Sequence, residues 1–185
     1  MDSRSSVTAS YGLTLRPGKY TLNVAVVDPK TGKGSVASTP VDVPDLSAGD
    51  LKMTPLVLLQ GIQEGGATPD PKEPLADFVL GTNRLVPSFD NSFPKSGSLS
   101  VVGAVYNAAK DAGGKSSVTW SFAILKDGKP VAKTDDQVVE AEMASPSIGP
   151  VPLSNFSPGK YVVQLKVKDN VASKEYTQDA PFEVK

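Results

Sequence analysis

The chain has 185 residues, a net charge of −1 and 39% hydrophobic residues, enough for one or two domains with a buried core. It contains no cysteine and no histidine, which excludes disulfides, thiolate chemistry and any catalytic or metal-binding imidazole. The near-neutral charge lacks the basic excess typical of nucleic-acid binding, so we expect no nucleic-acid partner. Sixteen glycines and sixteen prolines favour short strands joined by turns over a helical bundle.

No apolar run reaches the roughly 18 residues that a membrane-spanning helix needs, so we expect no membrane span. Residues 1–10 are polar and lack the apolar centre of a signal peptide. Met1 is therefore either a natural start or the start of an expressed piece of a longer protein.

Residues 1–50 predict a partial β-sandwich unit with three strands, at 6–15, 20–27 and 35–43. Each strand alternates apolar and polar side chains, as a strand with one face on a core does. Three strands with one apolar face cannot close a sandwich, so we interpret them as the last three strands of one. We expect the apolar face of these strands to be covered by strands upstream in a longer protein, by the second domain, by residues 51–59, or by another copy of the chain.

Residues 51–74 are interpreted as an apolar strand plus a linker. The segment 51–59 (LKMTPLVLL) ends in a continuous apolar run, which predicts that it is buried. The segment 60–74 is rich in glycine, proline and charge, which is typical of an exposed linker.

Residues 75–185 contain about seven predicted strands, enough for a complete immunoglobulin-like sandwich. In the strand 117–125, Trp120 shares the apolar face with Val118 and Phe122, which predicts a place in the core. The segment 137–143 is ambiguous between a strand and one helical turn.

An internal repeat links the two ends of the chain. Residues 15–28 read LRPGKYTLNVAVVD, and residues 156–169 read FSPGKYVVQLKVKD, without a gap and 141 positions later. This offset is too long for a solenoid, whose periods are about 20–50 residues, and it suits two copies of a domain-sized unit.

In each copy a tyrosine, Tyr20 or Tyr161, follows a Pro-Gly turn and enters a strand. This arrangement is similar to the tyrosine corner of immunoglobulin-like and fibronectin type III sandwiches, in which the phenol bonds to upstream backbone. We expect both residues to be structural. The alternative is a tyrosine that merely begins a strand.

The candidates for chemistry are carboxylates, and we expect them to be solvated. Two pairs of carboxylates are the candidates for acid–base catalysis: Asp135 with Asp136, and Glu140 with Glu142. Four aspartates were considered for calcium, but they lack an Asp-x-Asp-x-Asp-Gly loop: Asp28, Asp42, Asp45 and Asp50. We therefore predict no catalytic residue, no metal ligand and no cofactor.

Three aromatic residues are the candidates for a ligand-binding patch: Phe89, Phe93 and Tyr176. Phe89 and Phe93 do not fit strand alternation, so we expect them either to plug one end of the sandwich or to form an exposed recognition patch.

A series of short motifs runs through the chain, including RLVP at 84–87, VYN at 105–107, DGK at 127–129 and DNVAS at 169–173. This series resembles the C-terminal regions of large exported proteins of Acidobacteria, of the von Willebrand factor A-related and GWxTD-domain types. The defining motifs of those families, Asp-x-Ser-x-Ser and Gly-Trp-x-Thr-Asp, are absent from this sequence. The resemblance implies a tail module of a periplasmic or secreted protein.

The sequence predicts an all-β fold, with one complete immunoglobulin or fibronectin type III-like β-sandwich preceded by a partial N-terminal β unit. The leading functional hypothesis is a non-enzymatic structural or protein-interaction module. Its partner would be another protein, or a second copy in a homodimer, bound through β-strand edges. The alternative is a carbohydrate-binding accessory module of a secreted enzyme, which needs coplanar exposed aromatic rings.

Overall fold

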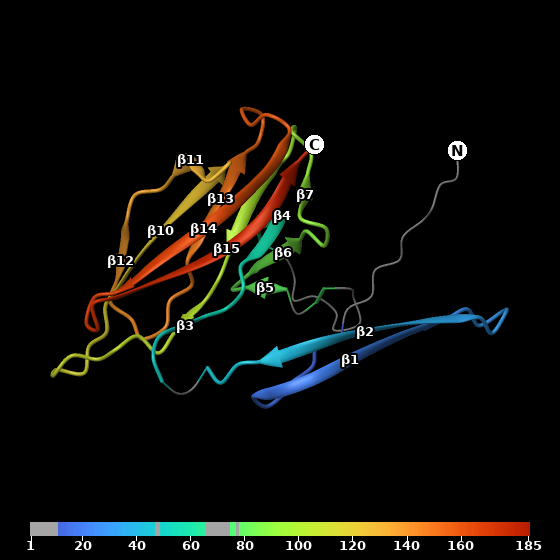
Figure 1. The fold of residues 1–185 in the computed structure, drawn as a ribbon, viewed down its shortest axis with the longest axis horizontal. Coiled ribbons are helices and arrows are strands. Elements are labelled where there is room, and N and C mark those ends of the chain that lie inside the picture. The colour runs from blue at the N-terminus through green and yellow to red at the C-terminus, as the bar shows by residue number, and fades with distance from the viewer. Residues whose placement is uncertain (1–10, 47–48, 66–74, 77) are drawn as a thin grey trace. The chain divides into compact units, whose positions relative to one another are not determined.

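The structure is a computed structural model that describes residues 11–46, 49–65, 75–76 and 78–185. All of the regular structure in these residues is β-strand (Figure 1). The chain divides into two compact units, one of residues 12–48 and one built mainly from residues 49–185.

The smaller unit is a long antiparallel hairpin of β1 (Gly18–Val27) and β2 (Gly34–Val43). The two strands pair without a break from Gly18 opposite Val43 to Val27 opposite Gly34. They match the strands predicted at 20–27 and 35–43. Of the strand predicted at 6–15, residues 6–10 lie outside the described residues, and residues 11–15 form no strand.

A second hairpin, β14 (Gly159–Asp169) and β15 (Lys174–Val184), repeats the first in its register. In the first hairpin Tyr20 lies opposite Val41, and in the second Tyr161 lies opposite Phe182. Each residue of the second pair is 141 positions after its equivalent in the first. The second hairpin is paired one step further toward its turn, so its connection has four residues, 170–173, against six, 28–33, in the first. The shared register extends along both strands of each hairpin, beyond the segments in which the sequences themselves are alike.

The larger unit contains two main sheets. The six-stranded sheet has the order β11-β10-β14-β15-β7, with β12 also paired to β10, and β7 is parallel to β15. Its remaining strands are β7 (Ser92–Phe93), β10 (Val118–Lys126), β11 (Lys129–Lys133) and β12 (Gln137–Val139). The ambiguous segment at 137–143 thus begins as a strand.

The five-stranded sheet has the order β13-β8-β4-β6-β5. Its strands are β4 (Val57–Gln63), β5 (Val79–Leu80), β6 (Asn83–Pro87), β8 (Ser98–Val102) and β13 (Ser147–Pro152). A short pair, β3 (Lys52–Met53) and β9 (Val105–Tyr106), lies outside both sheets.

One hydrophobic core joins the two sheets of the larger unit. Phe122 and Leu165 reach it from the six-stranded sheet, and Leu58, Leu99 and Val101 reach it from the five-stranded sheet. Apolar faces of two sheets buried against each other are consistent with the expected β-sandwich, and the all-β prediction is confirmed.

The larger unit begins earlier in the chain than the expected residue 75. Strand β4 is paired with β8 on one side and β6 on the other, in the middle of the five-stranded sheet. Leu51, Leu58 and Leu59 are buried, as their apolar run predicts. This segment is therefore part of the larger unit, because β4 is hydrogen-bonded on both sides to strands of that unit and Leu58 lies in its core.

Candidate functional site

The tyrosine of the second copy forms a buried corner. Its phenol donates a hydrogen bond of 2.7 Å to the carbonyl oxygen of Ser157, four residues upstream. The ring of Tyr161 stacks on Phe182 at 5.4 Å between centroids and meets the edge of Phe156 at 5.5 Å. Gly159, with φ +138°, supplies the backbone conformation that the turn requires.

The tyrosine of the first copy makes the same bond in a different environment. The Tyr20 phenol donates to the carbonyl oxygen of Arg16, also four residues upstream, at 2.9 Å. The exposed fraction is 37% for Tyr20 and 3% for Tyr161. Both phenols thus tie the chain to the backbone before the strand, as the predicted structural role requires, but Tyr20 has no second layer over it within its own unit.

A cluster that the sequence did not reveal surrounds the second corner. The Lys126 amine donates to the Ser157 hydroxyl at 2.5 Å and to the Tyr161 phenol at 3.3 Å, and it lies 4.9 Å from the centre of the phenol ring. Hydrogen bonding by the Ser157 side chain, aided by Lys126, lowers the pKa of Tyr161 from 10.0. Only folding brings these residues together, although each lies beside a turn that the sequence does predict.

The geometry of this cluster fits a structural cation better than a catalytic dyad. A lysine that activates a serine must accept the hydroxyl proton on a neutral amine. Here the Lys126 amine donates to both oxygens and lies over an aromatic face, which is where a charged ammonium is stabilised. We therefore assign the cluster to the tyrosine corner.

The outer face of the six-stranded sheet carries a depression of about 760 Å³. Leu125, Val162 and Pro181 lie in one row across β10, β14 and β15 and line it together. Charged residues also line it: Asp90, Asp127, Lys160, Asp179 and Glu183.

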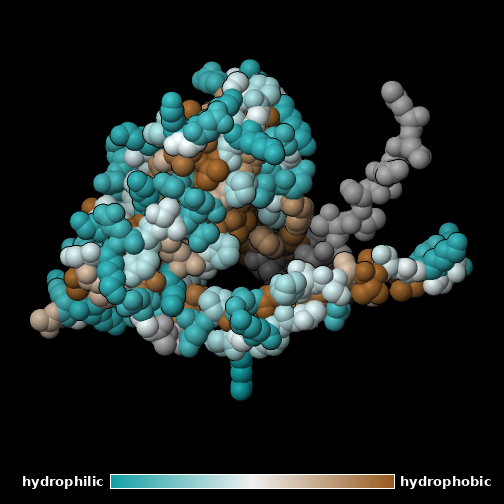
Figure 2. Space-filling model, viewed as in Figure 1, coloured by the Kyte–Doolittle hydropathy of each residue, from teal (hydrophilic) through white to brown (hydrophobic). Residues whose placement is uncertain are grey.

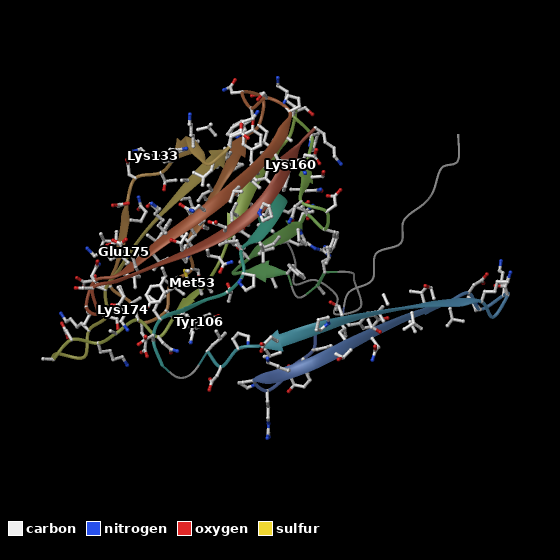
Figure 3. The ribbon with its side chains drawn as sticks, in the orientation of Figure 1. Met53, Tyr106, Lys133, Lys160, Lys174 and Glu175 are labelled. Carbon is white, nitrogen blue, oxygen red and sulfur yellow. The ribbon has the colours of Figure 1, made fainter. Side chains whose placement is uncertain are left out.

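The charges on this face compensate one another. Lys160 stands opposite Glu183 and Lys168 opposite Glu175, and Gln164 donates to Asp179 at 3.0 Å. Figure 3 shows Lys160 and Glu175 far apart along the same hairpin, with Lys133 on β11. Cross-strand pairs of this kind stabilise a solvated sheet, so the face by itself indicates no ligand.

The three candidate aromatic residues do not form a patch. Phe93 is 1% exposed and packs against Phe182 in an edge-to-face contact at 6.0 Å, so it plugs the core. Phe89 is 71% exposed. Tyr176 is half-buried against the core, eight residues along β15 from Val184, which is the partner of Phe93. Strand pairing puts Phe93 inside the core and Tyr176 near the other end of β15.

Trp120 packs against the core from a half-buried position. Its ring meets Phe122, two residues along the same face of β10, at 5.8 Å in an edge-to-face contact. The structure places it on the face that the sequence predicted, with less burial than the fully covered Phe122.

The carboxylates considered for catalysis are exposed. Asp135, Asp136 and Glu140 lie on the surface, and Glu142 forms an exposed ion pair of 2.8 Å with Lys110. None of these four carboxylates is buried.

The aspartates considered for calcium are dispersed. Asp28 lies at the turn of the first hairpin and Asp42 at its other end, opposite Lys19. Asp50 belongs to the larger unit and forms an ion pair with Lys174, which lowers the pKa of Asp50 from 3.8. Among the described residues, no three acidic side chains group as metal ligands do.

No protein-family model matches this chain, and a comparison with curated proteins gives no significant match. Within the part of the chain that the structure describes, no helix is long and apolar enough to cross a membrane.

The remaining unusual surface is one face of the first hairpin, which we call the hairpin face. It consists of alternate residues of the two strands: Tyr20, Leu22, Val24, Val26, Ser35, Ala37, Thr39 and Val41. None of these side chains is charged. Figure 2 shows hydrophobic residues along the outside of this hairpin. An isolated two-stranded hairpin is marginally stable in water, so such a face favours a covering partner.

Proposed function

We propose that this chain is a non-enzymatic, structural or protein-interaction module of a larger exported bacterial protein. The observation that carries the proposal is the contrast between the two hairpins. Tyr161, Val163 and Leu165 are buried, while Tyr20 and Leu22 are 37% exposed at equivalent positions. An uncharged sheet face without a second layer is a surface for binding protein.

We also propose that the larger unit is of the immunoglobulin or fibronectin type III kind. The neighbours β11-β10-β14-β15 match the order C′-C-F-G of those folds, and β13-β8 matches E-B. The corner tyrosine enters the strand equivalent to F. Strand β4 departs from the pattern. In those folds strand A pairs directly with strand B, whereas here β4 lies between β6 and β8, the strand that matches B.

A photo-crosslinking experiment tests the interaction role. A benzophenone amino acid replaces Leu22 on the hairpin face or, as a control, Thr21 on the opposite face of the same strand. In cells of the source bacterium, the proposal predicts crosslinks to protein from position 22 and few from position 21. Crosslinks from neither position, or equally from both, would contradict it.

Export is supported by the resemblance of the turn and strand motifs to the tails of exported proteins. The proposal predicts that an antibody against this chain detects it in the periplasmic or culture fraction. Detection in the cytoplasmic fraction alone, with a cytoplasmic marker as control, would contradict export.

A further inference from the structure

The edge of β1 that faces away from β2 is an unpaired strand edge. Among the described residues, β1 pairs only with β2. The Asp28 amide donates to the Lys33 carbonyl, so the backbone of Asp28 faces β2. Successive residues of an antiparallel strand direct their backbone groups to opposite sides, so every second residue before Asp28 faces away from β2. These outward-facing residues are all exposed: Lys19, Thr21, Asn23, Ala25 and Val27.

The other edges of the described sheets are short or contain proline. Strands β3, β5, β7, β9 and β12 have two or three residues each. Proline lies in each of the longer edge strands, in β2, β11, β13 and β15, at Pro40, Pro130, Pro150, Pro152 and Pro181. Proline has no amide hydrogen and prevents such an edge from pairing with a further strand. Strand β1 runs for ten residues with no proline and no register shift, so its edge is open to pairing.

The second hairpin shows what pairs with the equivalent edge. In the larger unit, β10 pairs antiparallel with β14, from Leu125 opposite Val162 to Val118 opposite Asp169. With the offset of 141 positions, this stretch of β14 corresponds to residues 21–28. The same backbone positions therefore bind an antiparallel strand in one unit and have no described partner strand in the other.

The side chains of β10 indicate the chemistry of the missing strand. Trp120, Phe122 and Ile124 alternate along β10 and lie opposite the core-side residues of β14. The equivalent residues of β1 are apolar and exposed: Leu22, Val24 and Val26. Cross-strand pairs of bulky apolar and aliphatic side chains stabilise a sheet, so a strand of the β10 kind is complementary to β1.

We propose that the open edge of β1 binds an extended strand of a partner protein, antiparallel to residues 21–28, with bulky apolar side chains at alternate positions. Backbone hydrogen bonds would hold the strand, and its apolar side chains would lie beside Leu22, Val24 and Val26. The proposal rests on the proposed interaction role and names the edge and the kind of partner.

Amide hydrogen exchange of the full chain tests the proposal, with a synthetic peptide of residues 117–126 (SVTWSFAILK) as the probe. Saturating peptide should slow exchange at Thr21, Asn23 and Ala25 by at least about tenfold, because their amides face the open edge. The amides of Leu22 and Val24 face β2 and should change little. Absence of protection at the outward-facing amides, or equal protection at both sets, overturns the proposal.

A pair of proline variants tests the edge by the binding of a fluorescently labelled peptide. Ala25→Pro removes an outward-facing amide of β1 and should abolish binding. Val36→Pro, directly opposite on β2, makes the same change at the other edge of the hairpin and should leave binding intact. Equal loss in both variants overturns the proposal, and exchange in the wild-type chain decides the case in which Ala25→Pro unfolds the hairpin.

Two further outcomes separate this proposal from the interaction role. Protection of the outward-facing amides that rises with protein concentration, without peptide, would show pairing between two copies and overturn the partner strand. If the peptide gives no protection while the benzophenone at position 22 still captures protein, the interaction role stands and only the strand addition is wrong.

Discussion

At the scale of the residue, the two corner tyrosines show that the same hydrogen bond contributes differently to stability in different surroundings. Each phenol donates to a carbonyl four residues upstream. Around Tyr161, the rings of Phe156 and Phe182 pack against the phenol ring, and only 3% of the tyrosine is exposed. Around Tyr20 water can replace the donor.

Replacing the buried phenol should therefore destabilise the larger unit. Tyr161→Phe keeps the ring stack and removes the donor, and we expect a loss of about 1–2 kcal/mol in the free energy of unfolding. Urea denaturation followed by tryptophan fluorescence measures it, since Trp120 belongs to the same unit. Tyr20→Phe is the matched control and should change the midpoint little. An unchanged midpoint in Tyr161→Phe would contradict the structural role.

The turn of the first hairpin should respond to acid. The Thr31 hydroxyl, together with the Lys30 amide, holds the pKa of Asp28 below its usual value of 3.8. Because the folded pKa is the lower one, the stabilisation is present above pH 3.8 and is lost as the pH falls through the folded value.

Carbon-detected NMR titration of the carboxyl group of Asp28 tests this prediction. The wild type should titrate below 3.8, and Thr31→Val should move the pKa back toward that value. A normal titration in the wild type, or no effect of Thr31→Val, would show that the hydroxyl does not hold the carboxylate.

At the scale of the element, the two hairpins place an aspartate at the same point of the turn, with different consequences. Asp28 accepts bonds within its own exposed turn. Asp169 is buried and accepts bonds from the amides of Val171 and Ala172 and, across the unit, from that of Ala109 at 2.8 Å. The turn of the second hairpin thus anchors the loop that leads into β10.

Removing the buried carboxylate should therefore cost far more than removing the exposed one. Asp169→Ala leaves three backbone amides without their acceptor. We expect a loss of about 3 kcal/mol in the free energy of unfolding, measured by urea denaturation. Asp28→Ala is the equivalent change in the other copy and should leave the larger unit unaffected. Similar losses in both variants would contradict the difference in roles.

Local patterns predicted the elements that are set by neighbours in sequence. The Pro-Gly corners and the alternation of β1, β10 and β14 follow from residues a few positions apart. The sequence could not assign β4 to its sheet, because β4 is fixed by pairing with β8 about forty residues later. For the same reason it could not bring Lys126 to Ser157 or pack Phe93 against Phe182.

At the scale of the whole molecule, the chain consists of two units with unequal means of stability. The larger unit has a closed core between two sheets, whereas the smaller is a hairpin with a single layer. A two-stranded hairpin contributes little stability of its own, so its order depends on what covers it.

Removal of the first 48 residues should show whether the larger unit is stable without the hairpin. The remaining chain, 49–185, should keep the thermal midpoint of the larger unit in calorimetry, because its core draws no residue from the hairpin. A large drop in the midpoint would contradict the division into units.

The shared register of the two hairpins also has a consequence for biosynthesis. The N-terminal hairpin β1–β2 is synthesised before the strands of the five-stranded sheet. It has the same strand register as the later hairpin β14–β15, which packs against that sheet. The two hairpins differ in the size of the side chains beside the corner tyrosine. Phe156 and Phe182 flank Tyr161, whereas Leu15 and Val41 occupy the corresponding positions beside Tyr20. Phe156 and Phe182 thus give the later hairpin a larger apolar contact at the corner than Leu15 and Val41 offer at the equivalent positions of the first.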